Sequence, residues 1–255
     1  MGATQRIRST AKWLAAGAGV AAASYAAYVG VTWYRYGQPR RRSEDEQPDL
    51  LLDRFMPTYE VCERHHARVA ASPETTFAAA CEMDLSRSPI ARGLFRSREL
   101  IMGGERDETV LPAGLLAMAK SLGWSVLAET PGREVVVGAI TQPWQPNVTF
   151  QSLPPDEFAG FAEPGWVKIA WTLRADPAGQ QETSFTTETR ATTTDPTSRA
   201  AFRRYWSFFS PGIVLIRRLS LRLLKEEAER RAGRARPAST EPRVTFQLPT
   251  TNSQA

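Results

Sequence analysis

The sequence is poor in the residues that build metal sites and disulfide frameworks. In 255 residues it has two cysteines, Cys62 and Cys81, and two histidines, His65 and His66. Adjacent residues of a regular strand point to opposite sides, so these two imidazoles cannot bind one metal ion. No CxxC or HxxxH spacing supplies further ligands. We therefore expect no metal and no cofactor, and two separate buried thiols rather than a disulfide.

Motifs of catalysis are also missing. The chain has no Gly-rich phosphate loop, and no nucleophile stands beside a recognisable base and orienting acid. A dyad of His65 with Cys62 or Cys81 is conceivable, but structural roles for these side chains are favoured. We assign no catalytic residue.

Lysine is scarce, and arginine carries most of the positive charge. Only four of the 32 basic residues are lysines, and 27 acidic residues leave a net charge of +5. Much of the excess lies beside an N-terminal apolar segment and in the C-terminal part of the chain. There the run that includes Arg217, Arg218 and Arg222 predicts either contact with anionic lipid headgroups or a solvated helix face. This distribution favours a membrane surface, and we expect no nucleic-acid partner.

Residues 13–34 form a 22-residue run without a charged side chain. With a rise of about 1.5 Å per residue, a helix of this length crosses a hydrocarbon core about 30 Å thick. Trp13 lies at one end and Trp33 and Tyr34 lie at the other, as in interfacial aromatic belts. We predict a transmembrane helix in a single-pass membrane protein. A cleaved signal peptide and a buried helix of a soluble protein are the alternatives.

Basic residues flank both ends of this predicted helix. Residues 1–12 form a basic flank with Arg6, Arg8 and Lys12, and the other flank carries Arg35 and the arginines at 40–42. The second flank has one charge more. The positive-inside bias therefore favours a cytoplasmic main domain.

Two polar segments enclose one domain-sized stretch. Residues 35–52 contain a basic block, an acidic block and prolines, which is typical of a solvated linker. Residues 232–255 are rich in Pro, Ser and Thr and predict a disordered tail. The intervening residues 53–231 have the size and composition of one globular domain.

Hydrophobic periodicity in residues 53–231 predicts an α+β domain. Ser-Pro pairs at 72–73 and 88–89 predict two short helices, and residues 111–123 predict a third. Asp195-Pro196 begins a long terminal helix that Pro211 should kink or restart. Alternation with period two predicts strands near 59–69, 124–129, 134–141, 147–152, 166–174 and 182–193, with a turn at 176–179.

This order of elements is similar to that of the START-like, or SRPBCC, superfamily, which includes polyketide cyclases and lipid-transfer domains. The stretches that carry the resemblance are VVVGAITQPWQPNVTF (135–150), GWVKIAWTLRADP (165–177) and residues 187–218, and it covers about residues 53–231. The resemblance implies a helix-grip fold, in which a curved antiparallel sheet surrounds a long C-terminal helix above an apolar cavity. It does not imply an activity, because the superfamily mixes carriers, receptors and enzymes.

Aromatic side chains of the predicted sheet and terminal helix are the candidates for lining such a cavity. The four that we select are Trp171, Phe185, Trp206 and Phe209.

Glu188 and Arg190 are the polar candidates, because period two places them on one face of the last strand. On an inward face the pair would contact a polar ligand group. On an outward face it would form an ion pair on the solvent side, which is the favoured alternative.

Together these features predict a membrane-anchored binding module for a hydrophobic small molecule or lipid. One alternative is a cyclase- or aromatase-like enzyme acting on a hydrophobic chain, which an acid–base pair in the cavity would favour. The other is an interaction protein whose core is filled by its own side chains, which the absence of a pocket would favour.

Overall fold

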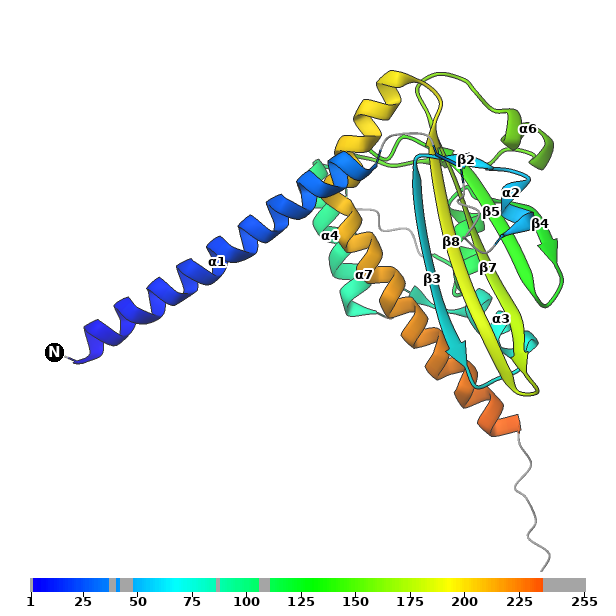
Figure 1. The fold of residues 1–255 in the computed structure, drawn as a ribbon, viewed down its shortest axis with the longest axis horizontal. Helices are drawn as coiled ribbons and strands as arrows, with labels where there is room; N and C mark the ends of the chain where they lie inside the picture. Colours follow the sequence, from blue (N-terminus) through cyan, green and yellow to red (C-terminus); the bar gives the residue numbers. More distant parts are fainter. Residues whose placement is uncertain (1, 37–39, 42–47, 86–87, 106–110, 236–255) are drawn as a thin grey trace, which may run out of the picture.

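A curved, six-stranded antiparallel sheet lies against a long C-terminal helix, which is the helix-grip architecture (Figure 1). The computed structural model describes residues 2–36, 40–41, 48–85, 88–105 and 111–235. The strand order is β3-β8-β7-β5-β4, and β6 pairs with β5. The predicted α+β class and helix-grip fold are confirmed.

The strands of this sheet are β3 (Val61–Val69), β4 (Ser125–Thr130), β5 (Glu134–Thr141), β6 (Phe150–Gln151), β7 (Val167–Gly179) and β8 (Glu182–Thr193). A separate pair joins β1 (Arg40–Arg41) to β2 (Thr58–Tyr59). The helices are α1 (Gly2–Arg35), α2 (Leu50–Asp53), α3 (Pro73–Glu82), α4 (Pro89–Met102), α5 (Leu115–Ser121), α6 (Pro155–Gly160) and α7 (Pro196–Ala235).

The helix starts follow from local capping chemistry. The Ser72 hydroxyl accepts a hydrogen bond from the Thr75 amide at the start of α3, and Ser88 serves the Ala91 amide in the same way in α4. Asp195 accepts hydrogen bonds from amides in the first turn of α7. All three predicted starts are confirmed.

The two faces of the sheet pack against different elements. On one face, residues of β5, β7 and β8 pack against α3 and the C-terminal half of α7, with Phe77, Leu224 and Ala228 in the core. On the other face, Val136 and Ala170 pack against Leu52 of α2 and Phe158 of α6. Period-two alternation therefore buries both sides of the central strands.

One local prediction is wrong. The turn predicted at 176–179 is strand, because β7 pairs with β8 as far as Pro177 opposite Thr183 and Gly179 opposite Glu182. A shift of register between Pro177 and Gly179 accommodates the proline, which has no amide proton to donate.

The long terminal helix does not restart at Pro211, since α7 runs through it. Two tyrosines of α1 contact this turn: the Tyr25 hydroxyl donates to the Phe208 carbonyl, and the Tyr28 hydroxyl lies 3.1 Å from Ser210 Oγ. Contacts from a neighbouring helix thus support α7 where proline removes one backbone hydrogen bond.

The folded part includes residues that the sequence places in a linker. Tyr36 is buried against Trp206, and Asp49 and Leu52 are also buried. The remaining predicted linker residues 37–39 and 42–47 lie outside the described residues, as does the predicted tail from 236 onwards. At the other boundary α7 continues to Ala235, four residues beyond the predicted end of the domain at 231.

Helix α1 extends away from the sheet as an arm, and the C-terminal part of α1 contacts α7 (Figure 1). Its segment Lys12–Arg35 is the one helix within the described residues that is long and apolar enough to cross a membrane, and its most apolar stretch is not buried in the protein. An N-terminal signal sequence meets the same criteria.

Candidate ligand cavity

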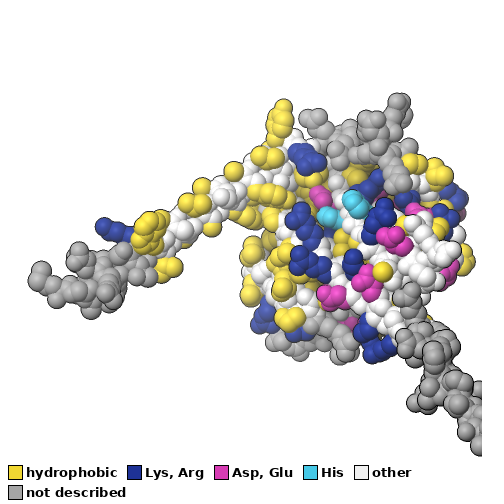
Figure 2. Space-filling view, turned by 60° about the horizontal axis from the view of Figure 1, so that its bottom comes forward, with side chains coloured by type: hydrophobic (Ala, Val, Ile, Leu, Met, Phe, Trp, Pro, Cys, Tyr) yellow, Lys and Arg dark blue, Asp and Glu magenta, His cyan; other side chains and the backbone are white. Residues whose placement is uncertain are grey.

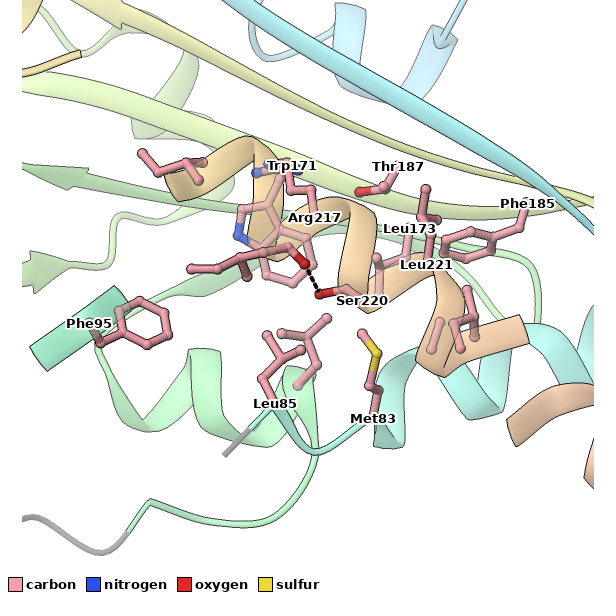
Figure 3. Close-up of a pocket in the computed structure, with 15 residues that line it drawn as sticks. Met83, Leu85, Phe95, Trp171, Leu173, Phe185, Thr187, Arg217, Ser220 and Leu221 are labelled. Atoms are coloured by element: carbon pink, nitrogen blue, oxygen red, sulfur yellow. Dashed lines mark hydrogen bonds between the residues drawn. The ribbon is translucent and has the colours of Figure 1, made fainter. Parts of the chain in front are cut away.

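An apolar cavity of about 210 Å³ lies between the sheet and α7. Its walls come from β7, β8, α3, α5, α7 and the region where α4 begins (Figure 3). The apolar lining residues are Ala80, Met83, Leu85, Phe95, Leu115, Trp171, Leu173, Phe185, Ile213, Ile216, Leu221 and Leu224.

Three polar side chains complete the lining: Thr187, Ser220 and Arg217. The Ser220 hydroxyl donates to the Ile216 carbonyl at 2.7 Å, so its proton is used within α7 (Figure 3). Thr187 lies on β8 two residues after Phe185, on the same strand face. The polar groups are few, which is the usual composition of a site for an apolar ligand.

Arg217 is the only charged residue among the described residues that line the cavity. One terminal nitrogen donates to the Thr189 hydroxyl, whereas the buried Nε has no hydrogen-bond partner. Burial lowers the pKa of Arg217 to about 10, against the opposing effect of Glu63, so the guanidinium stays charged at neutral pH. The cavity wall therefore carries one incompletely satisfied cation.

The cavity adjoins an external apolar groove of about 370 Å³. Phe95, Ile213 and Ile216 line both spaces, and the groove continues to Tyr25 of α1 and Ile101 of α4. Phe95 is about half exposed. The cavity and the groove thus share part of their apolar walls.

The four predicted aromatic residues do not share one site. Trp171 and Phe185 lie in the cavity wall (Figure 3). Trp206 instead packs in a separate cluster with Tyr36 and Phe202, and Phe209 lines the external groove. The long helix carries its aromatic residues one turn or more before the part that covers the cavity, and the sequence alone does not reveal this offset.

Glu188 and Arg190 lie on the opposite face of the sheet, so their assignment to the cavity is wrong. The solvent-side alternative is also wrong, because both side chains are fully buried. Arg190 donates to Glu188 at 2.7 Å, to Asp53 at 2.6 Å and to the Met56 carbonyl at 2.7 Å. The segment around α2 covers the pair, whereas the sequence predicts a linker for the residues before Asp53.

Both carboxylate oxygens of Glu188 have partners in the same network. Arg64 donates to the second Glu188 oxygen at 2.7 Å, and the Cys62 thiol lies 3.3 Å from the first. Although burial by itself lowers the pKa of Arg190, the Glu188 and Asp53 carboxylates outweigh burial and raise it. These contacts stabilise the docking of α2 on the sheet, and we assign them a structural role.

The contribution of Arg217 and of the residues before and within α4 to the cavity wall is not among the sequence-based predictions. Arg217 was assigned to a basic run at headgroups or in solvent, yet it lies among Ile213, Ile216 and Leu221 on the cavity side of α7. One charged residue within an apolar stripe at helical spacing is a signal that could have found it. Leu85 and Phe95 have no such signal, because their place depends on how α4 packs.

The cysteines and histidines do not form a site. Cys62 and Cys81 remain thiols, and burial raises the pKa of Cys81 to about 11. Burial and the nearby Arg217 lower the pKa of His65, whereas His66 points to solvent. Within the described part of the chain, no group of three or more His, Cys, Asp or Glu side chains is placed to hold a metal ion.

No model of a protein family matches the chain, and no curated protein matches it. Among solved structures, a conserved protein from Geobacillus kaustophilus is 11% identical, with a TM-score of 0.30 over 68% of this chain and 96% of that one. The Zhui aromatase/cyclase from Streptomyces sp. R1128 is 13% identical, with a TM-score of 0.24 over 67% and 94%. Norcoclaurine synthase from Thalictrum flavum, in complex with dopamine and hydroxybenzaldehyde, is 12% identical, with a TM-score of 0.29 over 78% and 99%. Scores this low carry no argument about function.

Proposed function

We propose that this protein is a membrane-anchored module that binds a hydrophobic small molecule or lipid in the cavity between the sheet and α7. The observation that supports binding is the cavity itself, whose lining is apolar apart from Thr187, Arg217 and Ser220. An apolar pocket with few polar groups is the usual form of a small-molecule site. The presence of this space also speaks against a core filled by its own side chains.

The exposed apolar surface of α1 supports membrane anchoring. Trp13 is 76% exposed, Leu14 70% and Val20 69%, and such a surface is stabilised when a bilayer covers it. Figure 2 shows hydrophobic side chains along α1 and on the neighbouring edge of the domain. Leu100 and Ile101 of α4 are exposed apolar residues of the domain. The four basic residues after the predicted span, against three before it, favour a cytoplasmic domain.

An enzymatic role has less support from the cavity. Among the described residues that line it, Arg217 is the one ionisable group, and no carboxylate or imidazole lines the cavity with it as a partner for acid–base chemistry. A binding function needs only the shape and the polar group that are present.

The membrane part of the proposal is tested on the full chain expressed in bacterial cells. We expect the protein to stay in the membrane fraction after alkaline washing, with an intact mass that includes the N-terminal segment. Release by alkali, or a mature mass that lacks this segment, would contradict a retained anchor.

The binding part is tested by native mass spectrometry of the full chain released from nanodiscs, followed by solvent extraction. We expect an extra mass on the wild type that is lost in Thr187→Phe, which fills the cavity from β8. Ser184→Phe places the same side chain on the other face of the same strand and should keep the mass. A bare wild type after incubation with cell lipid extract would contradict the proposal.

A further inference from the structure

Arg217 differs in its partners from two other arginines of the domain, Arg190 and Arg199. Arg190 pairs with Glu188 and Asp53, and Arg199 pairs with Glu60 at 2.9 Å. Arg217 makes no ion pair with any described residue, and its one hydrogen bond goes to the neutral Thr189 hydroxyl. Its Nε is buried without an acceptor.

The Glu63 carboxylate, which acts electrostatically on Arg217, is already engaged elsewhere. Glu63 contributes to the electrostatic field at Arg217, but its Oε1 accepts a hydrogen bond from the Tyr36 hydroxyl at 2.7 Å. Its Oε2 lies 3.7 Å from Nε2 of His65. The described side chains around Arg217 therefore leave its buried Nε–H without an acceptor.

A buried guanidinium with an unused donor is costly unless an acceptor reaches it. Since Arg217 is part of the cavity wall, a ligand is the group that can supply the acceptor. A carboxylate matches the planar donors of a guanidinium better than a hydroxyl or an amide does. We infer that Arg217 selects a ligand that carries a carboxylate on a compact apolar body; this rests on the proposed binding function of the cavity.

The size of the cavity narrows the ligand further. An apolar cavity of about 150 Å³ holds benzene, so the 210 Å³ found here suits one short alkyl chain or a small aromatic body. Trp171, Leu173 and Phe185 offer it apolar contacts on the sheet side. A two-chain phospholipid does not fit this volume.

The test compares octanoate with octanamide, which have nearly the same shape and differ in charge, as ligands of the full chain in nanodiscs. Calorimetric titration uses empty nanodiscs as the blank. We expect wild type to bind octanoate at least about tenfold more tightly than octanamide. In Arg217→Gln, octanoate should lose about tenfold in affinity, while octanamide changes by less than about threefold.

Two further variants keep the test decisive. Arg218→Gln removes the neighbouring exposed charge of α7 and should retain the octanoate preference. Arg217→Lys keeps the charge without the planar donors and should fall between wild type and Arg217→Gln. Thermal unfolding shows whether each variant is folded, and Arg217→Lys replaces Arg217→Gln as the deciding variant if the latter does not fold.

The outcomes separate this inference from the proposed function. Equal affinity of wild type for the two probes, or an octanoate preference that survives Arg217→Gln, would overturn the role of Arg217 while leaving an apolar binding cavity. Failure of wild type to bind either probe would overturn the small-molecule function and the inference with it.

Discussion

The two faces of strand β8 show two ways of burying charge in one sheet. Toward α7, the strand presents Phe185 and Thr187 to an apolar cavity, and Arg217 is the single charge among the described residues of its wall. On the opposite face, Glu188 and Arg190 are fully buried in a network that includes Asp53. One face holds a cation that has no ion pair with a described residue, and the other pairs its cation with Glu188 and Asp53 and so holds α2.

This difference teaches that burial alone does not mark a functional charge. Glu188 and Arg190 are the more deeply buried pair, yet their partners are other side chains of the domain. Arg217 has fewer partners and borders a space that a ligand can enter. The distinction between the two faces leads to four predictions.

The largest effect is expected from Arg190→Met. It removes the Arg190 cation from the buried Glu188 carboxylate and from the partly exposed Asp53 carboxylate, so the free energy of unfolding should fall by about 3–5 kcal/mol. Urea denaturation of the full chain in mild detergent measures it. Arg68→Met is the control, because it breaks an ion pair with Glu182 in which the Arg68 side chain is 73% exposed. The free energy of unfolding should then fall by less than about 1 kcal/mol. A loss for Arg190→Met as small as that for Arg68→Met would show that the network around Arg190 is not needed for stability.

Phe185→Ala tests the packing of the cavity face. Phe185 is 2% exposed, and its removal enlarges the cavity, so we expect a loss of about 3 kcal/mol in the free energy of unfolding. The same denaturation experiment applies, with Ser184→Ala on the other strand face as the control, expected within about 0.5 kcal/mol of wild type. A negligible loss for Phe185→Ala would mean that this wall collapses to fill the space.

Arg217→Met should behave differently from Arg190→Met. Because Arg217 has no carboxylate partner among the described residues, an apolar side chain of similar length should leave the free energy of unfolding within about 1 kcal/mol of wild type or raise it. Denaturation in the absence of added ligand measures this effect. A loss as large as that of Arg190→Met would show that the protein itself satisfies the Arg217 charge.

The smallest expected effect is the pH dependence of stability that Glu134 causes on the face of the sheet opposite the cavity. Burial and the adjacent Asp49 raise the pKa of Glu134 from 4.5 to about 7. The folded state therefore holds a proton that the unfolded state releases, so this contribution to stability is present below about pH 4.5 and is lost as pH rises through about 7.

In Glu134→Gln this dependence is removed. The melting temperature of wild type relative to Glu134→Gln should fall between pH 5 and pH 8. Comparing the two proteins cancels the titration of other groups. Parallel pH profiles would contradict the raised pKa of Glu134.

The local features of the fold were predictable from short stretches of sequence. Ser72, Ser88 and Asp195 cap the helices that they were expected to begin. Alternating residues placed most strands of the sheet within a few positions. These features depend on neighbouring residues, so a single sequence carries them.

The site was only partly predictable. Period two correctly groups Glu188 with Arg190 and separates them from Phe185, but it does not say which group faces α7. The continuity of α7 through Pro211 could not be predicted from neighbouring residues either, because Tyr25 and Tyr28 from a helix far away in the chain contact this turn. In both cases the decisive neighbours lie more than a hundred residues away.

The sequence by itself determined the order of helices and strands, the apolar N-terminal segment and the division of each strand into two faces, since these follow from propensity and periodicity. Only the tertiary structure decided that α2 closes a charged face and that α7 brings Arg217 to an apolar cavity. The reason is physical: whether a buried charge finds a partner depends on segments that meet only when the chain has folded.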